Sequence, residues 1–203
     1  MEKAVKMKGS VDISAVILAG GKNRRFGGKL KGLSMIEGRR IIDRELSVFR
    51  ELFDEILIIT NSPEQLNGIS GCVIVSDVFK KVGPLAGIHA AMKYSTKKSI
   101  FVFASDMPFL RSDLIAEQVN HSFIHKADAV IPQINGSIEP LHGIYQNHLL
   151  SKLEDYISSG DNYSLKGFLD KINVDLFIPI ITDDILRAFT NINTRGEAEK
   201  FGK

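Results

Sequence analysis

The chain has 203 residues, 26 of them basic and 24 acidic, with a formal net charge of +2 at pH 7. This length fits one large domain, and so small a net charge argues against general binding to nucleic acid or to a membrane. The single cysteine, Cys72, excludes an internal disulfide and a multi-cysteine metal site, and its apolar neighbours predict a buried structural role. No apolar stretch reaches 18 residues and no signal peptide is evident, which predicts a cytoplasmic protein.

Short, almost continuous apolar runs recur along the chain, with segments of helical spacing between them. Such runs are typical of strands that are buried on both faces in a parallel sheet. The expected strands are 14–18, 56–59, 72–75, 100–104 and 129–131. The expected helices are 40–53, a short helix at Pro63, 85–94 and 112–123. This alternation predicts a three-layer α/β/α fold with a mostly parallel central sheet and ligands at the carboxyl ends of the strands.

The last third of the chain is less regular. Residues 140–145 are interpreted as a strand, with antiparallel pairing as one option, and residues 147–156 as a helix. Ser164 is expected to cap a further helical stretch, residues 174–178 to be extended, and Thr194 with Glu197 to form the capping box of a terminal helix. We expect residues 1–12 to be a flexible extension and residues 13–203 to form a single domain.

A glycine-rich loop crowded with cations follows the first expected strand. Between Lys22 and Lys31 it has five basic residues and no acid, and Gly20, Gly21, Gly27 and Gly28 surround or interrupt them. Glycines let backbone N–H groups close on an anion, and fixed positive charges suit a phosphate chain. A solvated surface loop is the alternative. The spacing matches neither a Walker A loop nor the dinucleotide fingerprint, which disfavours a P-loop kinase and a Rossmann dehydrogenase.

Two further segments lie where an α/β sheet presents its ligands. Asp106 follows the expected strand 100–104, and a carboxylate there suits Mg²⁺ bound together with substrate phosphates; the alternative is a turn cap before Pro108. The segment 83–87, Gly-Pro-Leu-Ala-Gly, is read as a tight turn that opens a helix with unpaired N–H groups, or as a plain connection. Asp77 either accepts hydrogen bonds from a ribose or base or is simply solvated.

Five motifs occur in a single order along the chain. They are Leu18-Ala19-Gly20-Gly21 with Arg25 and Lys31, the segment 83–87, Asp106-Met107-Pro108, Glu139-Pro140-Leu141 and Asn191-Ile192-Asn193-Thr194. Together they resemble the molybdenum cofactor guanylyltransferases, the MobA-type members of the nucleotidyltransferase fold. The likeness covers nearly the whole chain after Asp12. The first motif is shared by many nucleotidyltransferases, whereas the segment 83–87 and the last two motifs are narrower.

The resemblance implies transfer of GMP from GTP to molybdopterin, with release of pyrophosphate. It implies Arg25, Lys31 and Asp106 as catalytic residues, with Asp106 also the ligand of Mg²⁺. The implied GTP site adds Leu18, Ala19, Gly20, Gly21, Asn61, Asp77, Gly83, Pro84 and Leu85. The implied pterin side consists of Glu139, Pro140, Asn191 and Asn193. Other cofactor-biosynthesis proteins and acceptor molybdoenzymes are the implied partners. Members of the family usually have Asp where this chain has Leu30, so a second acid is missing there.

The chemistry of such a transfer needs no general base, because the attacking phosphate is already an anion. The five histidines are interpreted as having no metal-ligand spacing.

The nearest alternative is an enzyme of the same fold that transfers CMP to molybdopterin or a nucleotide to a sugar phosphate. A non-catalytic nucleotide or pterin carrier is a more distant one. An RNA-binding regulator is disfavoured because aromatic residues do not alternate with the loop cations, among which Phe26 stands alone.

Overall fold

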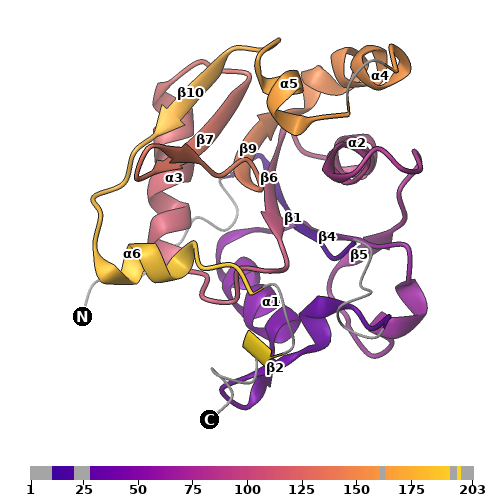
Figure 1. Ribbon diagram of the computed structural model, residues 1–203, viewed down its shortest axis with the longest axis vertical. Coiled ribbons are helices and arrows are strands. Elements are labelled where there is room, and N and C mark those ends of the chain that lie inside the picture. The colour runs from indigo at the N-terminus through magenta and orange to yellow at the C-terminus, as the bar shows by residue number, and fades with distance from the viewer. Residues whose placement is uncertain (1–10, 21–27, 161–162, 193–195, 198–203) are drawn as a thin grey trace.

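The computed structural model describes residues 11–20, 28–160, 163–192 and 196–197. A central sheet runs through the molecule between two layers of helices (Figure 1). Its strands, in spatial order, are β10 (Val174–Phe177), β7 (Ala129–Ile134), β9 (His142–Gln146), β6 (Ser99–Ala104), β1 (Ile13–Leu18), β4 (Ile56–Ile59) and β5 (Val73–Val75), and β8 (Ser137–Ile138) pairs with β7. The predicted three-layer α/β fold is confirmed.

The sheet is mostly parallel, as predicted. β1 lies between β4 and β6 and is parallel to both, and β10 is parallel to β7. β9 runs antiparallel to its neighbours β6 and β7, which confirms the antiparallel strand expected near residues 140–145. Because β9 reverses direction between two parallel strands, the carboxyl ends of β1, β4, β5, β6 and β7 share one edge of the sheet.

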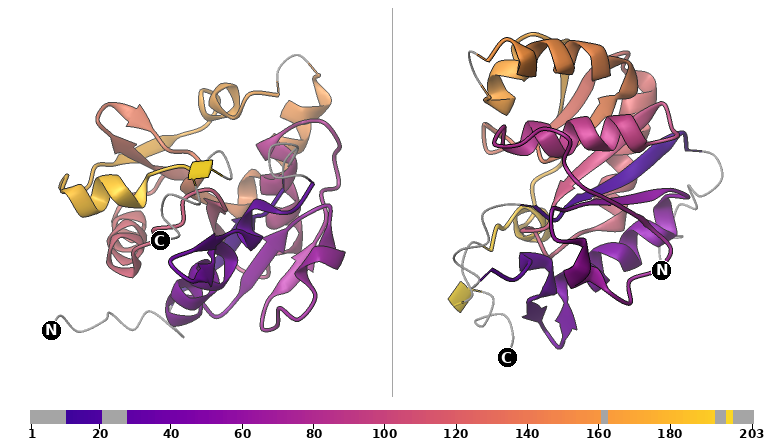
Figure 2. Two further views of the ribbon diagram at one scale, coloured as in Figure 1. Left: turned by 60° about the horizontal axis from the view of Figure 1, so that its bottom comes forward. Right: turned by 90° about the vertical axis from the view of Figure 1, so that its right-hand side faces the viewer.

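Helices cover both faces of the sheet. One layer holds α1 (Ile41–Leu52), α3 (Ser112–Ile124) and α6 (Asp183–Ala188), and the other holds α2 (Pro84–Tyr94), α4 (Leu150–Ser158) and α5 (Leu165–Leu169). The right-hand view of Figure 2 shows α2 and α4 on one side of the strands and α1 on the other. Successive residues of a strand point to opposite faces, so Phe101 and Phe103 pack in the first layer and Ile100 and Val102 in the second.

Several short elements connect this framework. They are the 3-10 helices η2 (Lys31–Leu33), η3 (Pro63–Leu66) and η4 (Asn147–Leu149), and the hairpin of β2 (Met35–Ile36) and β3 (Arg39–Arg40). The helix expected at Pro63 is therefore a single 3-10 turn, and the helix expected at 147–156 begins as one. The expected cap at Ser164 is confirmed, because its side chain accepts a hydrogen bond from Gly167 N at 3.2 Å. The hairpin, β8 and α6 were not predicted.

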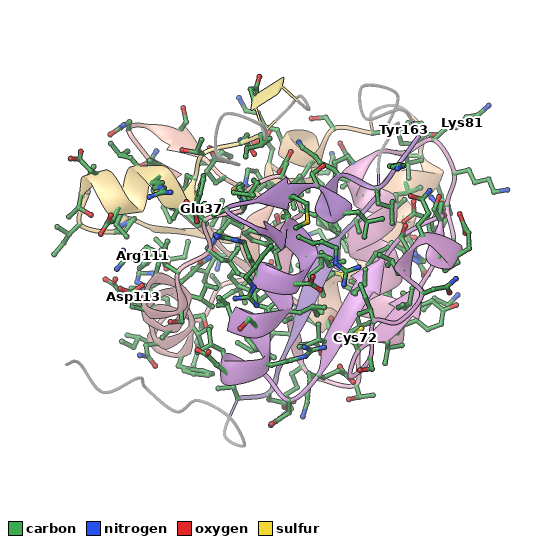
Figure 3. All side chains as sticks on the ribbon, turned by 90° about the horizontal axis from the view of Figure 1, so that it is seen from below. Glu37, Cys72, Lys81, Arg111, Asp113 and Tyr163 are labelled. Atoms are coloured by element: carbon green, nitrogen blue, oxygen red, sulfur yellow. The ribbon has the colours of Figure 1, made fainter. Side chains whose placement is uncertain are left out.

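β5 departs from the prediction that the strands are buried on both faces. Among the described strands it is the last in the sheet and pairs only with β4, and Val73 is 51% exposed. Cys72, directly before it, is half-buried near the surface of the molecule rather than fully enclosed (Figure 3). Burial still raises the pKa of its thiol, which disfavours the reactive thiolate.

The two ends of the chain are only partly described. Val11 is buried, and the carbonyl of Asp12 accepts a hydrogen bond from Ser99 N at 3.3 Å, so these two residues pack against the start of β6. Residues 1–10 and the start of the expected capping box, Thr194 and Arg195, lie outside the described residues. None of the described helices is long and apolar enough to cross a membrane.

Candidate active site

Side chains expected to bind a nucleotide gather at the carboxyl edge of the sheet. Leu18 ends β1 and Ala19 follows it, with Ala19 N donating to Ile59 O at 2.9 Å. Asp106 lies just beyond β6, where Ser105 Oγ donates to Leu18 O at 3.2 Å and joins the two strand ends. Gly20 is exposed at the start of the loop. Gly21 and Arg25 lie outside the described residues, so their predicted roles stay predictions.

Lys31 and Asp106 face each other across this edge. Lys31 Nζ lies 3.4 Å from Asp106 Oδ2, and the two side chains are 14% and 31% exposed. The pair joins the end of the glycine-rich loop to the end of β6. A cation and a carboxylate that are both accessible to solvent can together bind a phosphate and a divalent cation.

Leu30 precedes this lysine and is 2% exposed, packed in the core layer of α1 and α3. An acid at that position would therefore be buried among apolar side chains in this backbone arrangement. Position 30 therefore supplies no second carboxylate to the site.

Gln65 in η3 holds the end of the loop, a contact that the sequence analysis missed. Its Oε1 accepts a hydrogen bond from Leu30 N at 2.8 Å, and its Nε2 donates to Gly28 O at 3.2 Å. One amide thus pairs with both backbone groups that flank Lys29. The only sequence signal was the start of a helix at Pro63, which says nothing of what Gln65 contacts.

We expect Gln65→Ala to lower kcat/KM for the nucleotide by roughly tenfold, because two hydrogen bonds of about 1 kcal/mol each hold the loop end. The thermal midpoint should also fall, by roughly 4–8 °C if both hydrogen bonds are lost outright. Steady-state kinetics with the exposed Asn67→Ala as a control checks this. Equal kcat/KM for Gln65→Ala and wild type would show that the loop keeps its position without the two hydrogen bonds of Gln65.

Asn61 and Asp77 form a pair that joins the ends of β4 and β5. Asn61 Nδ2 donates to Asp77 Oδ2 at 2.7 Å, and Asp77 N donates to Asn61 Oδ1 at 3.3 Å. Burial raises the pKa of Asp77, and the hydrogen bond from Asn61 opposes this shift. Both residues were expected to contact the nucleotide, and the structure places them next to each other.

The predicted turn at 83–87 is the N-terminus of α2. Gly83 is the N-cap with φ +63° and ψ −143°, a conformation that L-residues rarely adopt, and Pro84 occupies the first helical position. Leu85 is fully buried, backbone included, so of these three residues only Gly83 and Pro84 expose backbone to a ligand. The expectation that Gly87 shapes the turn is wrong. Gly87 lies within α2, and a Cβ there would stand 2.8 Å from Leu18 Cδ2, so it permits close packing of the helix on β1.

The predicted pterin-side residues lie on the other side of Asp106. Ala104 N donates to Leu141 O at 2.9 Å, which places the segment of Glu139 and Pro140 beside the end of β6. Ile192 N donates to Asp106 O at 2.7 Å, which brings the segment of Asn191 to the same point. Burial, and secondarily the charge of Asp106, raises the pKa of Glu139. Asn193 lies outside the described residues.

Glu45 is a second acid near Asp106 that sequence reasoning missed. It lies on α1 and is 0% exposed, and neither carboxylate oxygen has a hydrogen-bond partner within the described part of the chain. Burial raises its pKa to about 8, and the charge of Asp106 adds to this shift. A signal was present, because position 45 continues the buried stripe of Ile41, Ile42 and Phe49 at helical spacing.

Comparison with known proteins agrees with this arrangement. Residues 15–174 match the family described as "MobA-like NTP transferase domain". The chain is 33% identical over 195 residues to the molybdenum cofactor guanylyltransferase of Desulfosudis oleivorans, and the match covers 93% of each chain. It is 31% identical to the probable molybdenum cofactor guanylyltransferase of Natranaerobius thermophilus, over 95% of this chain and 96% of that one.

Solved structures point the same way. Molybdopterin-guanine dinucleotide biosynthesis protein A from Archaeoglobus fulgidus matches with a TM-score of 0.77 and 27% identity, over 92% of this chain and 95% of that one. The 2-C-methyl-D-erythritol 4-phosphate cytidylyltransferase of Thermus thermophilus matches with a TM-score of 0.69, 94% and 97% coverage and 15% identity, a likeness of fold alone. The resemblance drawn from the motifs is confirmed, and the chain belongs to the MobA-like NTP transferase family of nucleotidyltransferases.

Proposed function

We propose that the protein transfers GMP from GTP to the terminal phosphate of molybdopterin, forming the guanine dinucleotide cofactor and pyrophosphate. The observation that carries the proposal is the position of the Lys31–Asp106 pair between two groups of side chains. Close relatives that bear the name guanylyltransferase support the same reaction. A non-catalytic carrier would have no need of a lysine and a carboxylate facing each other at the centre of the site.

The site divides at Asp106 into a nucleotide side and an acceptor side. On the nucleotide side lie the end of β1, the Asn61–Asp77 pair and the N-terminus of α2. On the acceptor side lie the segments of Glu139 and Asn191, which the backbone bonds of β6 and Asp106 hold in place. This division matches a reaction that joins two different phosphate-bearing molecules, because the reacting groups meet where Lys31 and Asp106 lie.

In the proposed reaction an oxygen of the acceptor phosphate attacks the α-phosphorus of GTP. The new bond joins that oxygen to the α-phosphorus, the bond to the bridging oxygen of the β-phosphate breaks, and pyrophosphate leaves with the electron pair. Because the nucleophile is already an anion, no side chain has to remove a proton. Lys31 stabilises negative charge on the phosphates, and Arg25 is proposed to do the same.

A divalent cation fits at Asp106. The carboxylate is 31% exposed beside Lys31, and nearby Glu139 adds a second carboxyl group to its surroundings, whereas Glu45 keeps its proton near neutral pH and adds no charge. We propose Mg²⁺, which binds through one or two carboxylates together with substrate phosphates. When bound, Mg²⁺ neutralises charge on the phosphates, while Asp106 holds it and Lys31 balances the remaining charge.

The proposal predicts that GTP is used far better than CTP, ATP or UTP. Guanine carries an acceptor at O6 and donors at N1 and N2, and the exposed backbone groups of Gly83 and Pro84 at the start of α2 are suited to pair with them. A base of the wrong pattern leaves desolvated groups unpaired at about 1–3 kcal/mol each, so two mispairings give discrimination of roughly a hundredfold or more.

Comparing kcat/KM for the four triphosphates, with molybdopterin as the acceptor, checks this prediction. Equal use of CTP and GTP would contradict the guanylyl assignment and favour the cytidylyl alternative. Turnover of a sugar phosphate in place of molybdopterin would contradict the proposed acceptor instead.

A further inference from the structure

Two histidines and an aspartate meet at the end of α3, away from the nucleotide site. His121 lies in the last turn of α3, and His125 is the residue that follows its end. Their imidazole rings stack with centroids 4.2 Å apart and planes inclined by 5°. Asp175 on β10 completes the group, with Oδ2 at 2.5 Å from His121 Nε2 and 3.4 Å from His125 Nδ1.

This arrangement corrects the interpretation that the histidines lack metal-ligand spacing. His121 and His125 stand four residues apart, which places two side chains on one side of a helix, as in helical zinc motifs. The third group comes from a strand far along the chain, so its presence was not evident from spacing. One ligand atom from each of the three residues lies within 4.8 Å of the other two.

The distances suit a single small cation. Zinc binds imidazole nitrogen and carboxylate oxygen at about 2.0–2.2 Å, so ligand atoms around one ion stand about 3.3 Å apart. The His125–Asp175 separation of 3.4 Å already has this value, and the His121–Asp175 separation of 2.5 Å has to open by less than a bond length. Rotation of the aspartate side chain, which is 30% exposed, accommodates that change. The two stacked rings also have to tilt toward one another, because an ion bound by both must lie near the plane of each ring.

The surroundings of the group favour an ordered but open site. The ring of Phe177 meets that of His121 edge-on, with the ring centroids 5.5 Å apart. The side chains of His121 and His125 are 24% and 47% exposed, so water can occupy the remaining coordination positions. Two imidazoles and one carboxylate are ligands for a borderline cation such as Zn²⁺, whereas Mg²⁺ prefers oxygen ligands alone.

The position of the group separates it from the proposed reaction. Asp175 pairs in register with Val130 near the amino end of β7, and α3 runs from the carboxyl end of β6 back to that amino end. Figure 1 shows α3 and β10 together at one side of the molecule. The group therefore lies at the edge of the sheet opposite to Asp106, and an ion there cannot serve the phosphates.

From these observations we infer that His121, His125 and Asp175 form a second metal site, which binds a divalent cation of the Zn²⁺ class and ties the end of α3 to the edge strand β10. The inference does not depend on the proposed guanylyl transfer, because none of its residues lies in the nucleotide site.

Equilibrium dialysis of the full chain against micromolar Zn²⁺ in millimolar Mg²⁺, followed by metal analysis, tests the site. The Asp106→Asn protein, in which the nucleotide-side carboxylate is removed, should retain one equivalent of Zn²⁺. Adding His121→Ala and His125→Ala to that protein should abolish the stoichiometric binding, with affinity lower by roughly 100-fold or more. His148→Ala, which changes another histidine paired with a carboxylate, Asp128, should leave binding unchanged.

Two further measurements address variants that fold poorly. Zn²⁺ should raise the thermal midpoint of the wild-type protein but not that of Asp175→Asn, compared with each protein's own midpoint without metal. Co²⁺ should produce visible absorption typical of nitrogen and oxygen coordination in the wild type and lose it in the double histidine variant. Failure of the wild type to bind Zn²⁺, or equal binding by folded double variant and wild type, would overturn the site and show a metal-free ion pair.

Discussion

Asp106→Asn should lower the rate of nucleotidyl transfer by roughly 100-fold or more while the fold is retained. The amide binds Mg²⁺ poorly, and it leaves the charge of Lys31 without the carboxylate that lies 3.4 Å away. The fold should survive because the backbone of Asp106, not its side chain, makes the contacts to Ala104 and Ile192 that hold this segment.

Single-turnover rates at saturating GTP, measured across a titration of Mg²⁺, distinguish metal binding from charge balance. If Asp106 holds the metal, the loss should be largest at limiting Mg²⁺ and partly relieved at high Mg²⁺. Asp113→Asn is a matched control, because Asp113 lies on α3 at the surface, where it pairs with Arg111 at 2.5 Å (Figure 3). An unchanged rate for Asp106→Asn at limiting Mg²⁺ would remove Asp106 from the metal site.

Glu45→Leu should stabilise the protein increasingly as pH rises. The pKa of Glu45 is raised from 4.5 to about 8 by burial, so the folded protein keeps a proton that the unfolded chain releases. Between these two values the unfolded state binds fewer protons, and the free energy of unfolding of the wild type therefore falls by about 1.4 kcal/mol per pH unit on account of this group. The loss begins near pH 4.5 and is complete above about pH 8, where it amounts to several kcal/mol.

Leucine has a similar size and no charge to bury, so the variant should lack this dependence. Urea unfolding from pH 5 to pH 9 should show that the stability difference between Glu45→Leu and wild type grows with pH and levels off near pH 8. Glu51→Leu, an exposed position on the same helix, controls for the general effect of removing a negative charge. Parallel pH profiles of Glu45→Leu and wild type would mean that Glu45 releases its proton without penalty in the folded protein.

The tertiary surroundings explain why Glu45 was missed as an acid near Asp106. Its place in the buried stripe of α1 is local information, which the sequence contains. The distance between its carboxyl group and the charge of Asp106 depends on how α1 packs against β6. The same holds for Gln65, whose contacts to Leu30 and Gly28 arise only when η3 folds against the loop.

What the sequence determined by itself is local. Apolar runs of strand length, helical spacing between them and an acid directly after a strand were sufficient for the alternating fold and for the placement of Asp106 at the carboxyl edge. These features depend on neighbours within a few residues, and parallel strands then bring their carboxyl ends together without further information. The order of the motifs was likewise enough to identify the family.

Only the tertiary structure decided which distant groups meet. In the folded protein β5 lies at the edge of the sheet, and Gly87 lets α2 pack closely on Leu18. Asn61 pairs with Asp77, and Asp175 contacts His121. Each of these outcomes depends on strand order or on the approach of two elements. Residues far apart in the chain carry no periodic signal of their contact, so the structure had to supply the contacts themselves.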